Sequence, residues 1–250
     1  MPFRGLSTSK VARLTGIHPN TVRLYEQWGY LSPVERTASG YRVYTPLHIQ
    51  QVRLVRLVFG AVWAGRVIRQ AGIAVVRASA AQDLAAAQAL AEKHLQVVHK
   101  EQAQAEAAAE VLQRWAENRP ASEDEPKLHI GEAAHLLDVS VDMLHNWERN
   151  GLLEVPRHPR NGYRLYGERE ISRLRVIRLL LKSGYSMMAV LRMLVQLERG
   201  EAGDLRAALD TPRPDEDVFS AADRWLTTLA EAERLAVEAI LLVQEMKGSA

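Results

Sequence analysis

Cysteine is absent from this 250-residue sequence, and so are long uninterrupted apolar runs. Without cysteine the chain forms no disulfide, no thiolate metal site and no cysteine redox switch. It has no run of about 18 uncharged apolar residues, and residues 1–20 lack the apolar stretch of a secretion signal. We therefore expect a cytoplasmic protein.

The sequence motifs of common enzyme classes are also missing. There is no Gly-rich phosphate loop of useful spacing, no GxSxG and no HExxH. His94 and His99 are five residues apart, which places them on different faces of a helix and argues against a shared metal. The sequence thus predicts no enzyme activity, no catalytic residue, no metal site and no cofactor.

One stretch of the chain occurs twice, as residues 8–57 and 130–179. A shift of 122 residues superimposes the two copies without a gap. The clearest match joins residues 40–44 (GYRVY) to residues 162–166 (GYRLY). An internal duplication of this length predicts two domains of similar fold.

Charge is distributed unevenly along the chain, although the net charge is only +2. Residues 1–75 hold ten Lys and Arg against two acidic residues, and residues 127–200 hold twelve against eight. The segments 76–126 and 201–250 are acidic, with net charges of −4 and −6. Basic repeats separated by acidic segments favour a polyanionic partner for the repeats.

The first repeat predicts two short helices joined by a tight turn. One helix is expected over residues 8–14, with Leu14 on its buried side. The second is expected over residues 21–28, with Trp28 among its apolar contacts and Gly29 as its stop. Two helices with such a turn are typical of a helix-turn-helix, whose second helix enters the major groove.

The residues that follow predict a β-hairpin and two more helices. Residues 35–40 are polar turn formers, and residues 41–44 alternate as a strand does. A hairpin beside a helix-turn-helix is a wing. Further helices are expected over residues 46–59 and 64–71.

This first repeat resembles the DNA-binding domain of the MerR family of bacterial transcription regulators. The resemblance rests on residues 21–26 (TVRLYE), 29–31 (GYL) and 40–44 (GYRVY), followed by a helix. It is specific because recognition helix, Gly stop and wing occur at family spacing twice in one chain. The resemblance implies a mostly α fold with two small β wings, in a nucleoid-associated protein that binds double-stranded promoter DNA.

The expected domains follow from the duplication and from two long helical stretches. They are a first winged helix-turn-helix domain (1–75), a long coiled-coil helix (80–118), a linker (119–126), a second winged domain (127–200) and a C-terminal coiled-coil helix (218–247).

The residues expected at the DNA come from the turn, the recognition helix and the wing of each copy. In the first copy they are His18, Asn20, Thr21, Arg23, Tyr25, Arg36, Tyr41, Arg42 and Tyr44. In the second copy they are Ser140, Asp142, His145, Asn146, Trp147, Arg149, Arg157, Arg160, Tyr163, Arg164 and Tyr166. The arginines expected to contact phosphates are Arg23, Arg36, Arg42, Arg157, Arg160 and Arg164.

The second copy departs from the family pattern in its recognition helix. His145 stands at the place of Arg23, the arginine that anchors this helix on DNA in the resembled family. Asn146 follows it, and an Asn that reaches a base edge suits adenine. Two readings stay open: the second copy also binds DNA, at a different half-site, or it is a degenerate copy that forms an interface.

The two long helices predict how the parts assemble. Residues 82–118 contain strong helix formers and carry an apolar seam in steps of four and three, interrupted by Gln102. In the resembled family such a helix pairs antiparallel with that of a second subunit. Because residues 218–247 supply a second long helix, we expect a monomeric pseudo-dimer, with a homodimer as the rival.

The resulting interpretation is a transcription regulator that distorts promoter DNA through two unequal half-site readers. RNA polymerase stays open as a partner. An architectural or recombination accessory protein that bends DNA is the alternative, and an adaptor with vestigial winged repeats is a third. No effector is assigned, because core packing accounts for Trp115, Trp225 and the methionines Met187, Met188 and Met193 at least as well as a ligand pocket does.

Overall fold

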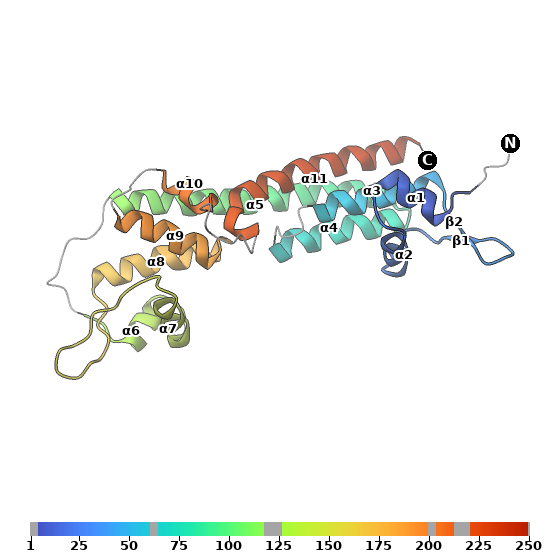
Figure 1. The fold of residues 1–250 in the computed structure, drawn as a ribbon. Coiled ribbons are helices and arrows are strands. Elements are labelled where there is room, and N and C mark those ends of the chain that lie inside the picture. Colours follow the sequence, from blue (N-terminus) through green and yellow to red (C-terminus); the bar gives the residue numbers. More distant parts are fainter. Residues whose placement is uncertain (1–4, 61–64, 118–126, 200–203, 213–220, 250) are drawn as a thin grey trace. The chain divides into compact units, whose positions relative to one another are not determined.

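A computed structural model describes residues 5–60, 65–117, 127–199, 204–212 and 221–249 of the chain. The described residues are mostly helical, with one two-stranded antiparallel sheet (Figure 1). The chain divides into two compact units, and the first comprises Met1–Lys100 and Thr228–Ala250. The second comprises Glu101–Thr227, so each unit holds one copy of the duplicated stretch. The expected linker, residues 119–126, lies outside the described residues.

The first copy begins with the two expected helices, α1 (Thr8–Thr15) and α2 (Pro19–Gln27). Gly16 ends α1 in the left-handed conformation, at a φ of 66°. α2 starts two residues earlier than expected because His18 caps it and Pro19 occupies its first position, where proline loses no hydrogen bond.

A short hairpin follows α2. Strand β1 (Glu35–Arg36) pairs antiparallel with β2 (Arg42–Val43), with Arg36 opposite Arg42. Gly40, at a φ of 82°, makes the turn possible. The predicted hairpin is therefore present, although the paired part is shorter than residues 41–44.

Helices α3 (Pro46–Gly60) and α4 (Gly65–Ala80) complete this domain. The prediction of a fourth helix over residues 64–71 was too short at its C-terminal end. α4 continues through Gly72 to Ala80. A glycine stands at this position because α4 packs closely against Val58 of α3. A Cβ there would approach Val58 Cγ1 to 2.4 Å.

Three apolar side chains of the helix-turn-helix are exposed. Leu14 is 44% exposed, Leu24 40% and Trp28 54%, whereas Val11, Ala12 and Val22 form the core. Leu14 was therefore wrongly assigned to the buried side of α1. Helical periodicity placed Leu14 correctly on a helix, but it could not show whether a neighbouring helix covers that side of α1.

Helices α5 (Leu84–Glu117) and α11 (Trp225–Gly248) are the two expected long helices. In the first unit they run antiparallel, since Lys247 donates to Gln88 and His99 pairs with Glu233. Their small residues pack with α3 and α4 in one core, which includes Ala87, Ala91, Ala239 and Val243.

The seam predicted on the middle helix is only partly right. Ala91, Val98, Ala105, Ala109 and Leu112 are buried as expected, but Ala87, His94 and Ala108 are buried as well. His94 fills a place beside Gly72, and its neutral form is favoured because burial lowers its pKa. His99, one and a half turns on, is exposed.

The second unit repeats the same order of elements. α6 (Ile130–Leu136) and α7 (Val141–Arg149) correspond to α1 and α2, and α8 (Glu168–Lys182) and α9 (Met187–Glu198) correspond to α3 and α4. The hairpin here is reduced to a single bridge between Arg157 and Arg164. A short helix α10 (Leu205–Asp210) and the 3-10 turn η1 (Ala221–Arg224) precede α11.

The C-terminal half of α5 is bound into this second unit by polar contacts as well as by its apolar face. Trp115 Nε1 donates to Ser172 Oγ at 2.8 Å, and the buried Tyr185 hydroxyl donates to the carbonyl of Ala105 at 3.1 Å. Trp225 and Met193 are buried, as expected for core residues. Among the described residues, no helix combines the length and the hydropathy that a membrane crossing requires.

The crossing at Gly72 generates a stability prediction. We expect Gly72→Ala to lower the free energy of unfolding by about 1–3 kcal/mol, because the added methyl group meets Val58 in a packed core. Gly131→Ala is the matched control, since it lies in α6 with nothing within 4 Å of its Cβ position. That control should leave stability unchanged or raise it by up to about 1 kcal/mol. Urea denaturation of both variants is the measurement, and equal effects would contradict the close crossing.

Candidate nucleic-acid interface

A single carboxylate connects the hairpin of the first copy to helix α2. Glu26 Oε2 accepts a hydrogen bond from Arg42 Nε at 2.6 Å, and Glu26 Oε1 lies 3.8 Å from an Arg36 nitrogen. Arg36 belongs to β1 and Arg42 to β2, so both strands are tied to one helical residue. The Glu26 hydrogen bond raises the pKa of Arg42, so the guanidinium stays protonated.

The second copy builds the same arrangement from different residues. Glu148 on α7 accepts from Arg164 Nε at 2.6 Å and lies 3.7 Å from an Arg157 nitrogen. In both copies the outer arginine also donates to a turn carbonyl at 3.4 Å, Arg36 to Gly40 and Arg157 to Gly162. We call each carboxylate with its two arginines a hairpin clamp.

The residues predicted to face DNA fall into three groups by exposure. The exposed group contains His18, Asn20, Arg23, Arg36, Tyr41, Ser140, Asp142, Asn146, Arg149, Arg157, Arg160 and Tyr163. The half-buried group contains Thr21, Tyr25, Arg42, His145 and Arg164. The buried group contains Tyr44, Trp147 and Tyr166.

The three buried aromatic residues correct the prediction. Tyr44 is 0% exposed, Tyr166 1% and Trp147 4%, so their rings belong to the domain cores and not to an open surface. In each hairpin the buried tyrosine lies three residues after an exposed one, Tyr44 after Tyr41 and Tyr166 after Tyr163. Successive side chains of a strand point to opposite faces, so residues three apart also lie on opposite faces.

The exposed face of α2 carries a preorganised arginine. Arg23 donates to Asn20 Oδ1 at 2.8 Å, and the ring of His18 caps the helix by accepting from Asn20 N at 3.2 Å. The corresponding positions on α7 are Asp142 and His145, and Ser140 provides the cap. The two helices therefore present different chemistry from the same scaffold.

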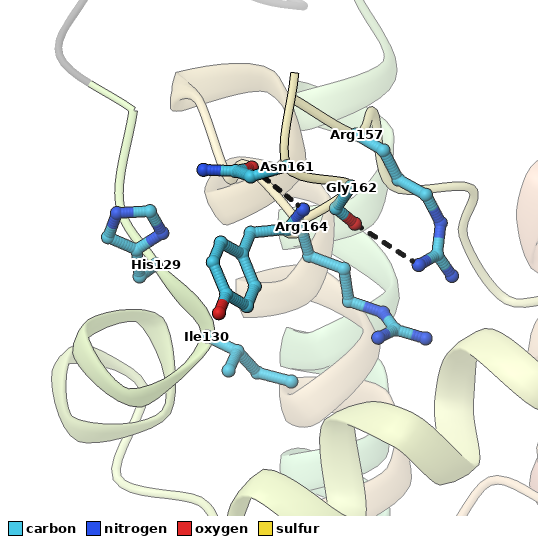
Figure 2. A pocket seen from close by; sticks show the side chains of 7 residues that line it. His129, Ile130, Arg157, Asn161, Gly162 and Arg164 are labelled. Atoms are coloured by element: carbon cyan, nitrogen blue, oxygen red, sulfur yellow. Dashed lines mark hydrogen bonds between the residues drawn. The ribbon is translucent and has the colours of Figure 1, made fainter. Parts of the chain in front are cut away.

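A basic hollow lies beside the hairpin of the second copy. Its volume is about 540 Å³, and it is lined by His129, Ile130 and the hairpin residues Arg157, Asn161, Gly162, Tyr163 and Arg164 (Figure 2). The rings of Tyr163 and His129 pack edge-on, with centroids 6.3 Å apart, and Asn161 Oδ1 accepts a hydrogen bond from Tyr163 N at 3.1 Å. The hollow presents guanidinium groups at the surface on which the DNA-facing residues were predicted.

The clamp carboxylates and the lining residues His129 and Asn161 were missed as site residues. Glu26 and Glu148 were part of the motifs but received no role. A signal was available, because each lies sixteen residues before an arginine of the repeated GYR motif. In the described parts of the chain, no group of three or more His, Asp or Glu is placed to hold a metal ion.

Two family models match the two copies separately. Residues 7–44 match the model described as "MerR family regulatory protein", and residues 128–197 match "MerR HTH family regulatory protein". Both copies of the duplicated stretch are therefore similar to MerR-type regulators. The two matched regions contain the two hairpin clamps, in agreement with the resemblance read from the motifs.

Curated relatives match the chain over limited regions. The HTH-type transcriptional regulator CueR of Escherichia coli O6:H1 is 37% identical over 51 residues, which are 20% of this chain and 38% of that protein. The mercuric resistance operon regulatory protein of Bacillus cereus is 30% identical over 76 residues, 30% of this chain and 58% of that protein. The matches thus cover less than two thirds of either relative. No solved structure matches the chain.

The tyrosines beneath the two hairpins differ in one respect. Tyr44 donates its hydroxyl hydrogen to Glu26 Oε2 at 3.2 Å, whereas the buried Tyr166 hydroxyl has no hydrogen-bond partner in the part of the chain that the structure describes. Burial raises the pKa of both phenols, so both hydroxyls stay protonated.

This difference predicts opposite costs for the same substitution. We expect Tyr44→Phe to lower the free energy of unfolding by about 0.5–1.5 kcal/mol, because a hydrogen bond to a carboxylate is lost. Tyr166→Phe should leave stability unchanged or raise it, because it removes a buried hydroxyl that has no partner. Thermal or urea denaturation measures both. Equal losses would mean that the two hydroxyls are satisfied alike.

Proposed function

We propose that this chain is a transcription regulator that binds double-stranded promoter DNA with two winged helix-turn-helix domains. The observation that carries the proposal is the hairpin clamp. In both copies an arginine Nε of the hairpin lies 2.6 Å from a carboxylate oxygen of the helix. A protein whose helix enters the major groove while its hairpin contacts flanking phosphates needs a fixed orientation between the two elements. α2 and α7 are the proposed recognition helices, and the two hairpins are the wings.

The exposed arginines are the proposed phosphate contacts. Arg23 and Arg160 are exposed, and so are the clamp members Arg36 and Arg157. Arg42 and Arg164 are half-buried and hold their carboxylates at 2.6 Å, so we assign them to positioning rather than to the main phosphate contacts. Each phosphate contact that an arginine makes releases condensed counterions, which makes binding depend on salt.

The two domains read different half-sites in this proposal. The Arg23 guanidinium, preoriented by Asn20, suits guanine or a phosphate. α7 offers Asn146 for adenine and the carboxylate of Asp142, which accepts from cytosine N4 and repels phosphate. An imperfect palindrome is therefore the expected operator.

A single chain supplies the parts of a family dimer in this proposal. Support comes from the first unit, where the C-terminal part of α11 packs antiparallel to α5 and shares a core with α3 and α4. It also comes from the second unit, where the C-terminal part of α5 contacts α8 through Trp115 and Ser172. Each domain thus binds the end of the long helix that follows the other domain, which is the exchange expected of a pseudo-dimer.

By family analogy, the bound protein distorts its promoter and so realigns the contacts of RNA polymerase. The cost of deforming DNA, a few kcal/mol for a modest bend, is offset by phosphate contacts. In vitro transcription on a bound promoter tests this step. Binding and bending without any change in transcript level would favour an architectural or recombination accessory protein instead.

The operator and the mass of the protein test the pseudo-dimer. Selection of bound sites from random DNA should return one site with two unequal halves in a fixed orientation. Light scattering should give a mass near 28.0 kDa in solution. A mass near twice that value, together with sites containing two identical halves, would contradict the pseudo-dimer.

The clamp generates a prediction about salt dependence. Glu26→Gln removes the negative charge that holds Arg36 and Arg42, so both guanidinium groups become available to phosphates. We expect tighter binding to unrelated DNA, a plot of log K against log [salt] that is steeper by about 1–2, and poorer discrimination of the selected site. The reason is that charge is gained while the orientation of the wing is lost.

The control for this prediction is Glu35→Gln, which removes the same charge from an exposed position on β1. The affinity of Glu35→Gln for unrelated DNA should rise only by the effect of one lost negative charge. Its preference for the selected site over unrelated DNA should stay the same. Filter binding or fluorescence anisotropy over a salt series measures both variants. If Glu26→Gln and Glu35→Gln behave alike, the clamp has no role in positioning the wing.

A further inference from the structure

A cavity of about 660 Å³ lies against helix α7 in the second unit. It opens between α7 and the facing ends of α8 and α9, and its size falls in the range of about 300–1,000 Å³ that small-molecule sites occupy. The apolar part of its lining consists of Val139, Met143, Trp147, Leu181 and Met187. Of the methionines and tryptophans considered as ligand contacts from sequence, only Met187 lines this cavity.

In the first copy, a residue equivalent to one of the cavity lining belongs to an aromatic cluster. Phe59 stacks on Tyr30 with ring centroids 5.6 Å apart, and Tyr25 lies 6.3 Å from Tyr30. With the shift of 122 residues, the positions of Phe59 and Tyr30 hold Leu181 and Leu152 in the second copy. Of these two leucines, only Leu181 lines the cavity, while the position of Tyr25 holds the lining residue Trp147. The cavity thus borders a place where the first copy has a phenylalanine and the second a smaller leucine.

The charges at the rim of the cavity balance. Arg178 pairs with Asp138 at 2.8 Å, and the exposed Asp142 and Lys182 carry opposite charges. A ligand with a net charge of either sign would gain from one exposed rim group and be repelled by the other. The lining therefore selects for a neutral molecule with mainly apolar surface.

We propose that this cavity binds a neutral, largely apolar aromatic molecule, and that binding changes how the second domain reads its half-site. The ligand would contact Met143 and Trp147 on α7 and Leu181 on α8. The regulatory half of the proposal rests on the proposed DNA-reading role of α7, but the binding half does not.

Coupling between ligand and DNA follows from the position of the cavity. Asn146, which lines the cavity, is also an exposed residue of the proposed reading face, and Asp142 is another. A ligand that fixes the distance between α7 and α8 favours one orientation of the reading face. Because linkage is reciprocal, operator DNA then changes the affinity for the ligand by the same factor.

The binding half is tested on the full chain without DNA. The probe is N-phenyl-1-naphthylamine, a neutral aromatic fluorophore that brightens in apolar sites, titrated by fluorescence. We expect saturable binding with one molecule per chain, and affinities at least tenfold weaker for the anionic probe 8-anilinonaphthalene-1-sulfonate and the cationic probe rhodamine 6G. Absence of saturable binding, or tighter binding of either charged probe, overturns the proposal.

Two neighbouring methionines supply a matched pair of variants. Met187→Trp places a large ring at the cavity wall, whereas Met188, the next residue, is 54% exposed and does not line the cavity. The neutral probe should bind Met187→Trp at least tenfold more weakly and Met188→Trp within twofold of the original chain. Leu181→Phe, which introduces the ring that the first copy has at this position, should also weaken binding of the neutral probe. It tests the same cavity if Met187→Trp does not fold. Equal binding by all variants overturns the assignment to this cavity.

The regulatory half is tested with operators that keep one intact half-site. Saturating probe should change affinity at least threefold for DNA that keeps the half read by α7, and should leave DNA that keeps the half read by α2 unchanged. Equal shifts at both operators overturn the coupling. Failure to bind any DNA would sink the proposed function, and the probe titrations would still decide whether the cavity binds its ligand.

Discussion

The contact between a helix carboxylate and two hairpin arginines is the interaction on which each domain depends for its exposed geometry. A two-residue hairpin is too short to be stable by itself. Glu26 on α2 and Glu148 on α7 supply the acceptor oxygens. Each of these helices starts at a side-chain cap and ends before a glycine of positive φ, Gly29 at 70° and Gly151 at 77°. The outer arginines of the clamps, Arg36 and Arg157, are exposed, and exposed ion pairs contribute only roughly 0.2–1 kcal/mol to stability. What the clamp contributes is therefore mainly orientation, because a carboxylate with two oxygens can hold both strands at once.

The two copies keep the clamp while the surrounding polar contacts differ. In the first copy a buried network joins the loop after α2 to α3 and α4: Gln51 Oε1 accepts from Ser32 N at 2.9 Å, and Gln51 Nε2 donates to the carbonyl of Ser79 at 2.9 Å. The position of Gln51 is Arg173 in the second copy, where it donates to the carbonyl of Leu152 at 2.7 Å and pairs with Glu198. A neutral amide and a charged guanidinium thus connect the same loop to the same helix. The constraint is the satisfaction of a backbone group at that place, and more than one side chain meets it.

Local signals in the sequence predicted most of the helices and both hairpins. Gly16, Gly29 and Gly151 have positive φ, and Ser140 and Ser186 cap their helices, so chain reversals were readable from residue type. The predicted end of the fourth helix at residue 71 lies just before Gly72, a glycine that close packing against Val58 requires inside α4 and that local reasoning does not explain. For the same reason, Leu14 was assigned to the core, and Tyr44 and Trp147, which are buried, were placed among the DNA contacts. The identity of the neighbours decides these cases, and that is set by tertiary packing.

The site was predictable as a set of positions but not as a set of roles. Periodicity and motif placed the arginines on the hairpins, yet Arg42 and Arg164 are each held at 2.6 Å by a carboxylate, and this changes what they can do. An arginine already paired inside the protein gains less from a phosphate than an unpaired one, since the contact must compete with an existing charge-assisted hydrogen bond. It follows that two repeats with the same number of arginines need not have the same affinity for DNA. Such a difference would come from residues outside the clamp that vary between the copies: Arg23 against His145 on the reading face, and Phe59 against Leu181, which lines the cavity beside α7.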